Sequence, residues 1–304
     1  MARKGEYDEQ TLQKFKRSGR ILRETREELK DFVREDAPVI DICERAEHLI
    51  RQKGGKPAFP CNVSINDVAA HYTSPPADKK KVPEKSIVKV DIGAHVDGYV
   101  ADTAVTVCFD PDLGGLVETA ETALRKAVES IEPGISTSKL GTIIENTIKS
   151  RGFKPISNLT GHQVGRFRVH AGTSLPNVSH LLSSKIKLGA VYAIEPFVTL
   201  KNAAGRVEDD KESTIFRFVK SRSQRSRHGK QLLKYVEENF RTLPFAERWL
   251  QNVVPDECYH EAFKELLRSK AIIDYPIFVE ASRKPVAQAE HTVLIVEGGC
   301  EVLT

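Results

Sequence analysis

The sequence VDIGAHVDGYVAD, residues 90–102, holds two aspartates, Asp91 and Asp102, among apolar residues. Such residues are typical of buried strands, in which aspartate is disfavoured. Asp97-Gly98, between them, is a strong hairpin signal. A turn at Val96-Asp97 would place Asp91 and Asp102 directly opposite each other, and a turn at Asp97-Gly98 would place them diagonally on one face. Both registers bring the two carboxylates close together.

Two partly buried carboxylates repel each other unless a positive charge lies between them. A divalent metal ion is the simplest such charge, because carboxylates suit hard or borderline cations. The alternative is a pair of surface aspartates on a solvated face. The hairpin thus indicates a candidate metal site.

Helices are predicted on both sides of this hairpin, from apolar spacing and from end signals. They span residues 8–33, Pro38 to Gly54-Gly55, 116–131 and 138–151, and the hairpin strands fall within 87–109. Four residues then recur at an offset of 98: Ile50, Gly54, Lys56 and Pro57 return as Ile148, Gly152, Lys154 and Pro155. The echo favours a duplicated half, with two unrelated helix ends as the alternative.

Three more polar residues lie in unusual surroundings. His162 is in a glycine-flanked segment, Glu195 is within the apolar run 191–197, and Glu290 precedes the apolar run 291–296. Glu195 and Glu290 would form a second hairpin that matches the first. Four carboxylates and His162 between two half-domains would form a dinuclear metal site.

Residues 217–272 differ in composition from the segments around them. The run 220–230 holds five Lys or Arg and no acid, and three short helices are predicted at 231–240, 246–253 and 258–269. Apolar strand-like residues follow. We therefore expect a helical insertion at 217–272 in a catalytic domain formed by residues 1–216 and 273–304.

Bulk properties exclude several classes of protein. The 304 residues are 40% hydrophobic and 29% charged, and the net charge of +4 does not by itself indicate a nucleic-acid binder. The N-terminus has no apolar signal region, and no run is long enough to span a membrane. The five scattered cysteines lack CxxC spacing. We expect a cytoplasmic protein with reduced thiols.

These motifs resemble the methionine aminopeptidases of the pita-bread fold, in metallopeptidase family M24, and above all their archaeal and eukaryotic type II branch. The likeness covers nearly the whole chain and includes the runs FPCNVSIN, AAHYTSP, VDIGAH, GYVAD, VHAG, IEPF and EHT. It implies an α/β (α+β) fold with two pseudo-symmetric halves around a curved mixed or antiparallel sheet. It also implies that the insertion is winged-helix-like.

The resemblance implies a role for each matching residue. Asp91 would hold one metal ion, Asp102 and Glu290 would bridge two ions, and His162 and Glu195 would complete the second site. Glu195 would also move a proton. The ions would be two divalent cations, drawn from cobalt, manganese, iron and zinc.

Four further positions would contact the substrate. His170 would hydrogen-bond the peptide near the scissile carbonyl, and His71 would do so on the leaving side, both in catalytic roles. Phe59 and Val169 would line the pocket for the methionine side chain.

The implied activity is removal of the initiator methionine from nascent polypeptide N-termini when the second residue is small. We expect a monomer without membrane contact. The basic segment 220–230 would contact the ribosome transiently, or would be only a solvated loop. The alternatives are an Xaa-Pro peptidase of the same fold and a non-catalytic scaffold that binds RNA or ribosomes.

Overall fold

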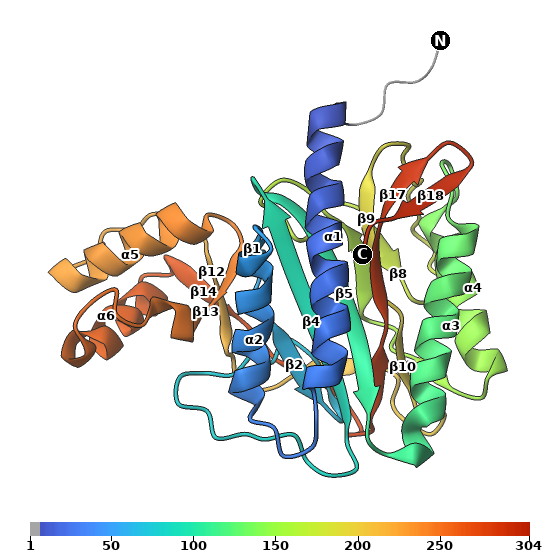
Figure 1. Ribbon diagram of the computed structural model, residues 1–304, viewed down its shortest axis with the longest axis horizontal. Helices are drawn as coiled ribbons and strands as arrows, with labels where there is room; N and C mark the ends of the chain where they lie inside the picture. Colours follow the sequence, from blue (N-terminus) through green and yellow to red (C-terminus); the bar gives the residue numbers. More distant parts are fainter. Residues whose placement is uncertain (1–6) are drawn as a thin grey trace.

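The computed structural model describes residues 7–304, and its centre is one long antiparallel sheet (Figure 1). The strand order is β1-β4-β5-β17-β9-β7-β8, with β18 beside β17 and β2 beside β4. Helices α1 and α2 pack on the half with β4 and β5, and α3 and α4 pack on the half with β9 and β17. All four helices lie on one face of the sheet, which leaves the other face free to carry a site.

The elements of the first half are α1 Glu9–Phe32, α2 Val39–Gln52, β1 Lys56–Pro57, β2 Asn62–Ile65, β3 Val68–Ala70, β4 Ile87–Val96 and β5 Tyr99–Cys108. The 3-10 turn η1, Pro111–Leu113, leads to α3 Gly114–Ser130, α4 Thr137–Ser150, β6 Lys154–Pro155, β7 Thr160–Gln163, β8 Ser174–Pro176, β9 Val191–Ile194, β10 Phe197–Thr199 and β11 Val207–Asp209. After the insertion come β15 Phe278–Glu280, β16 Val286–Gln288, β17 Glu290–Val296 and β18 Gly299–Val302.

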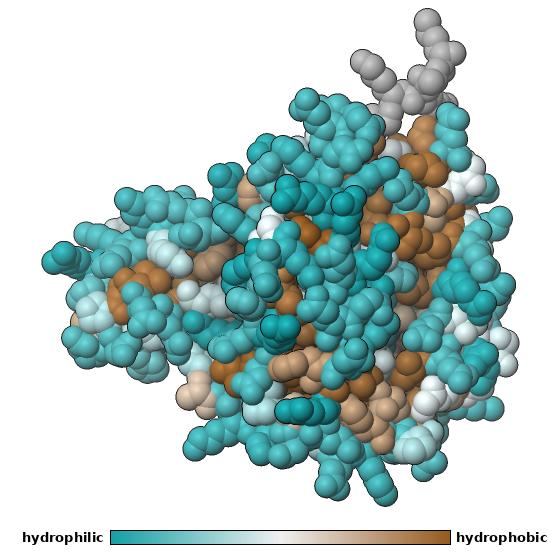
Figure 2. All heavy atoms as spheres, in the orientation of Figure 1, coloured by the Kyte–Doolittle hydropathy of each residue, from teal (hydrophilic) through white to brown (hydrophobic). Residues whose placement is uncertain are grey.

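Local signals account for the helices. The Asp8 side chain caps α1 by accepting a hydrogen bond from the Thr11 backbone N–H, and Ser136 caps α4 in the same way through Lys139. Both helices have one apolar face, which is buried against the sheet. Hydrophilic side chains cover most of the outer face of the helices, and patches of hydrophobic residues show between them (Figure 2).

The two halves repeat each other with the spacing that the sequence predicts. Helices α2 and α4 have 14 residues each, and α4 begins and ends 98 residues after α2. Gly54 and Gly152, which follow them, have φ values of +83° and +84°, in the left-handed region that glycine tolerates best. Lys56-Pro57 and Lys154-Pro155 then each form a two-residue strand. The duplicated-half interpretation is therefore confirmed.

The first hairpin has the second of the two registers that the sequence allows. The turn is Asp97-Gly98, so that Asp91 pairs with Ala104 and Gly93 with Asp102. The two aspartates lie diagonally on one face. That face is opposite to the one on which Val90 and Ile92 join the core beneath α1 and α2.

The second pair of strands differs from the prediction at Glu195. Strand β9 ends at Ile194 and β10 starts at Phe197, so Glu195 lies between strands and not within one. Pro196 gives the reason, because it has no N–H to donate to a ladder. The register nevertheless continues across this break. His291 pairs with Ile194 and Gln288 with Phe197, which places Glu290 opposite Glu195.

The insertion is not wholly helical, and the prediction of a helix at 246–253 is wrong. Its elements are β12 Ile215–Phe218, α5 Arg227–Phe240, β13 Pro244–Ala246, the 3-10 helix η2 Glu247–Leu250, α6 Asp256–Arg268 and β14 Ile272–Tyr275. Strands β13 and β14 flank β12 in a separate sheet. Residues 244–246 become a strand because they pair with β12, which is distant in sequence. Strand β12 also begins before the predicted boundary at 217, and β14 runs past the one at 272.

The insertion has its own hydrophobic core, formed by α5, α6 and the three strands, and it projects from the side of the molecule next to α2 (Figure 1). Among residues 7–304, no helix combines the length and the apolar character that a membrane crossing requires.

Candidate metal centre

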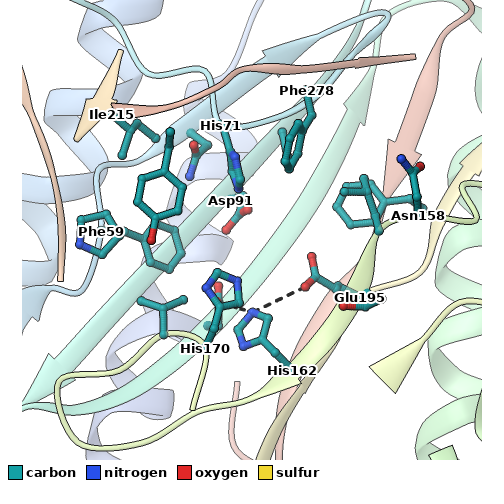
Figure 3. Close-up of a pocket in the computed structure, with 18 residues that line it drawn as sticks. Phe59, His71, Asp91, Asn158, His162, His170, Glu195, Ile215 and Phe278 are labelled. Atoms are coloured by element: carbon teal, nitrogen blue, oxygen red, sulfur yellow. Dashed lines mark ion pairs between the residues drawn. The ribbon is translucent and has the colours of Figure 1, made fainter. Parts of the chain in front are cut away.

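Five acidic or histidine side chains from both halves converge on the face of the sheet without helices. Asp91 comes from β4, Asp102 from β5, His162 from β7 and Glu290 from β17, and Glu195 follows β9. The Nε2 atom of His162 lies 3.6 Å from Asp102 Oδ2 and 3.5 Å from Glu195 Oε1 (Figure 3). Donor atoms of Asp102, His162 and Glu290 all lie within 4.8 Å of one another.

Asp91 and Glu195 lie beside this group of three. Both line the same pocket as Asp102 and His162, and Figure 3 shows their carboxylates directed into a shared space. The five residues that the sequence singled out as metal ligands therefore lie together.

Burial disfavours the charged form of every one of these groups. Burial raises the pKa of Asp91 to about 7. It raises the pKa of Asp102 and Glu290 well above the usual range, and the neighbouring carboxylates add to the effect. It lowers the pKa of His162 to about 3, which keeps the ring neutral and able to donate a lone pair.

The cluster fits a divalent cation for a further reason. Three of its buried carboxylate oxygens have no hydrogen-bond partner among residues 7–304: Asp91 Oδ1, Asp102 Oδ1 and Glu290 Oε1. Buried polar atoms rarely lack a partner in folded proteins. Carboxylate oxygens and an imidazole nitrogen, here His162 Nε2, are donors that borderline divalent ions accept.

Two residues that the sequence analysis missed hold the carboxylates in place. The Gln288 side-chain amide lies 3.3 Å from Glu195 Oε2 and 3.4 Å from Glu290 Oε2. The Thr292 hydroxyl accepts from the Asp102 N–H at 2.8 Å and donates to the Asp102 carbonyl at 2.7 Å. Each lies two residues from Glu290, Gln288 at the end of β16 and Thr292 within β17, and period-two spacing around a candidate ligand would have been the signal.

The pocket beside the cluster has a volume of about 220 Å³. Phe59 and Val169 line it, as the resemblance implies, and both side chains are buried. The Phe59 ring lies against Gly93, where any side chain would collide with it. Further wall residues come from segments that no sequence pattern joins, among them Asn158, Ile215, Tyr275 and Phe278.

The two other predicted histidines both line this pocket. His71 has a left-handed backbone with φ of +66°, and its Nδ1 atom lies 3.2 Å from the Pro276 carbonyl oxygen. Its ring packs on Phe278 and Tyr275. Burial lowers the pKa of His71 to about 4. At neutral pH its ring is an uncharged hydrogen-bonding group.

His170 lies at the pocket rim, with its ring centroid 4.3 Å from that of His162. Burial of the ring lowers the pKa of His170 as well. His71 and His170 thus reach the pocket from different loops (Figure 3).

A cluster of four carboxylates, two buried and two half-buried, with a neutral histidine and two further histidines beside it, has the construction of a metal-dependent hydrolase. Residues 13–221 match the model of metallopeptidase family M24, and the chain belongs to that family. Membership of this metallopeptidase family implies a divalent metal, and the carboxylate and histidine cluster is the candidate site for it.

Relatives of known function match along nearly the full length. A methionine aminopeptidase of Methanothermobacter thermautotrophicus is 40% identical over 296 residues, which is 96% of this chain and 98% of that protein. One from Thermococcus kodakarensis is 41% identical over 289 residues, 95% of this chain and 97% of the relative.

Solved structures show the same pita-bread fold. A thermophilic Arx1 superimposes with a TM-score of 0.84 at 17% identity, over 97% of this chain and 91% of that one. The methionine aminopeptidase of Thermotoga maritima gives 0.71 at 23% identity and covers 98% of both chains. A prolidase of Pyrococcus furiosus gives 0.64 at 17% identity, and the match covers 98% of this chain but only 64% of the prolidase.

Proposed function

We propose that this protein is a methionine aminopeptidase, which hydrolyses the peptide bond after an N-terminal methionine when the second residue is small. The observation that carries the proposal is that a cluster of five candidate metal ligands lies beside a pocket whose apolar wall includes Phe59 and Val169. The full-length similarity to archaeal methionine aminopeptidases supports it. The Xaa-Pro alternative has no comparable support, since the prolidase match leaves about a third of that enzyme uncovered.

Two divalent ions complete the site in this proposal. Asp91 would hold one ion, His162 and Glu195 would hold the other, and Asp102 and Glu290 would serve both. Cobalt, manganese, iron and zinc all suit these donors. When bound, the ions supply Lewis acidity toward the scissile carbonyl and an activated water.

The remaining chemistry belongs to side chains of the protein. Glu195 accepts a proton from the attacking water and passes it to the leaving amine. Its hydrogen bond from Gln288 orients the carboxylate for this role. His170, at the rim, donates to the scissile carbonyl as negative charge develops there. His71, fixed by the Pro276 carbonyl, binds the peptide on the leaving side.

The pocket selects the side chain of the first residue. Phe59 and Val169 offer a narrow apolar surface, and methionine, which is unbranched and polarizable, fits such a surface well. The pocket volume of about 220 Å³ next to the metal cluster has room for one methionine side chain. The free α-amino group of the substrate would then lie at the carboxylates.

The wider setting of the enzyme follows from the same proposal. Its partners are nascent polypeptide N-termini, it works as a monomer in the cytoplasm, and residues 217–272 form an insertion in a catalytic domain of residues 1–216 and 273–304.

The basic segment 220–230 has three exposed arginines, Arg222, Arg225 and Arg227. They would make transient phosphate contacts with ribosomal RNA. Co-sedimentation with ribosomes across a salt series tests this contact, and absence of binding at low salt rejects it.

Release of free methionine from Met-Ala-Ser tests the activity. Chelated protein should be inactive, cobalt or manganese should restore release, and His162→Ala should abolish it. An Xaa-Pro dipeptide should not be cleaved. Folded protein that releases no methionine with any of the four metals would refute the proposal.

A further inference from the structure

A second cleft continues from the metal pocket. Its volume is about 470 Å³, and it shares four wall residues with the pocket: Val169, His170, Pro244 and Tyr275. His170 is the rim histidine, and Tyr275 contacts His71 edge-to-face with ring centroids 5.7 Å apart. The cleft therefore opens where the two substrate-binding histidines are, next to the expected position of the scissile bond.

The cleft lies between the insertion and the loop that carries His170. Phe167 and Arg168 form one wall, and Arg217 on β12 with Asp274 on β14 forms the other. The walls are joined, because the Thr242 hydroxyl donates to the Phe167 carbonyl. The Arg241 guanidinium also lies 4.5 Å from the centre of the Phe167 ring. These contacts preform the cleft before anything binds.

The cleft carries uncompensated positive charge. Within residues 7–304, neither the Arg168 nor the Arg217 guanidinium forms an ion pair with a carboxylate. The Arg217 guanidinium lies 5.9 Å from the centre of the Tyr275 ring, at the junction with the metal pocket. The only acidic residue on the walls is Asp274, which is exposed and accepts a hydrogen bond from the Ser213 hydroxyl.

We propose that this cleft binds the third and following residues of the polypeptide substrate, and that Arg217 and Arg168 make the enzyme prefer acidic side chains there. The inference rests on the proposed function, because it concerns the part of a polypeptide substrate that continues beyond the scissile bond. An extended peptide advances about 3.3 Å per residue, so a few residues span the cleft. Opposite charges on the peptide and the guanidinium groups would raise the association rate and add modest affinity.

Amidated pentapeptides that differ only in charge test the proposal. Met-Ala-Glu-Glu-Ser and Met-Ala-Lys-Lys-Ser keep the same first two residues, and amidation removes the terminal carboxylate that would itself bind an arginine. At low salt the acidic peptide should have a kcat/KM about fivefold higher, the size expected of one or two exposed ion pairs. The difference should shrink at high salt, because such pairs are screened.

Charge reversal assigns the effect to the cleft. Arg217→Glu should reverse the preference, and Arg217→Gln should abolish it without the risk of a new negative charge beside Tyr275. Arg20→Glu on α1 makes the same change in net charge at an exposed site away from the cleft, and should keep the wild-type preference. Equal rates for the two peptides in wild-type protein, or a preference unchanged in both Arg217 variants, would overturn the proposal.

Binding measured without turnover separates this inference from the proposed activity. The same peptides with a fluorophore at the amidated end are titrated with chelated protein, and anisotropy is read. Tighter binding of the acidic peptide that depends on Arg217, without methionine release in metal-loaded protein, would support the cleft and refute the activity. Methionine release with no charge preference in either assay would refute the cleft alone.

Discussion

Gly93 shows how one missing side chain shapes the substrate pocket. It pairs with Asp102 across the β4–β5 hairpin and lies against the Phe59 ring. Gly93→Ala should push this ring into the pocket, since a Cβ there would overlap the ring carbons. Overpacking costs about 1–3 kcal/mol, so we expect kcat/KM for Met-Ala-Ser to fall roughly tenfold or more, mainly through KM.

Gly114 provides the control for this change. A Cβ at Gly114 meets no atom within 4 Å, and the residue starts α3 far from the pocket in sequence. Gly114→Ala should leave both kinetic constants unchanged. A Gly93→Ala enzyme with wild-type KM would contradict the placement of the methionine side chain beside Phe59.

His95 makes the stability of the protein depend on pH. Its Nδ1 atom accepts a hydrogen bond from the Gly98 N–H at 3.0 Å. Burial, and then the charge of Lys56, lowers the pKa of His95 to about 4. In the unfolded chain the pKa is about 6.5. The unfolded state therefore takes up a proton first as the pH falls, so stability is complete above pH 6.5 and is lost as the pH falls toward 4.

Between pH 7 and pH 5 this residue should cost about 2 kcal/mol of the free energy of unfolding. His95→Asn keeps an acceptor near the Nδ1 position and does not titrate, so its urea-unfolding curves should shift less between the two pH values. The other buried histidines contribute equally to both proteins. An equal shift in wild type and variant would show that His95 is not the group responsible.

At the scale of elements, the insertion is held to the catalytic domain through a buried ionic network. The Arg248 guanidinium in η2 donates to the Glu47 carboxylate in α2. It also donates to Thr73 Oγ1 at 2.9 Å and to the Ser74 carbonyl at 3.2 Å. The Trp249 indole N–H donates to the other Glu47 oxygen at 2.6 Å. Thr73 is two residues from His71, so the network also supports a pocket loop.

Arg248→Met should destabilise the protein by about 3–5 kcal/mol, because it leaves the buried Glu47 charge without its partner. Adding Glu47→Gln should recover part of the loss, since glutamine carries no charge and can still accept a hydrogen bond. Trp249 is the only tryptophan in the chain, so its fluorescence during urea unfolding reports this interface directly.

Arg268→Met on α6 serves as the matched control, because that side chain is 72% exposed. Its effect should stay within about 0.5 kcal/mol. If the double variant Glu47→Gln/Arg248→Met is no more stable than Arg248→Met alone, the uncompensated charge is not the cause of the loss.

At the scale of the whole molecule, the candidate metal ligands come from both halves. Asp91 and Asp102 belong to the first half, and His162, Glu195 and Glu290 to the second. Metal at a hundred times its Kd should add about 2.7 kcal/mol to the free energy of unfolding. Scanning calorimetry should show a higher unfolding temperature with manganese than with a chelator.

Asp91→Asn should reduce this gain, because Asp91 would hold one of the two ions, and it should not destabilise the metal-free protein. Burial already disfavours the Asp91 carboxylate, as its raised pKa of about 7 indicates, so a neutral amide costs nothing by comparison. Asp31→Asn, at an exposed position of α1, should keep the metal effect. A full metal-induced shift in Asp91→Asn would exclude this residue as a ligand.

Much of this architecture could be predicted from local patterns. The hairpin around Asp97-Gly98, the four large helices and the 98-residue repeat follow from periodicity and end signals, which act over a few residues. The candidate ligands could be selected because carboxylates are rare in apolar strands. The amino-acid sequence by itself thus determined the two halves and the residues that meet between them.

Only the tertiary structure decided the features that depend on distant partners. Residues 244–246 form a strand because β12 offers a pairing edge, and Glu290 lies opposite Glu195 because β17 pairs with β9. Segments more than a hundred residues apart combine to form the pocket wall at Asn158, Tyr275 and Phe278, and also the cleft beside Arg217. Local propensities carry no information about such contacts, since burial and strand pairing are fixed only when the whole chain packs.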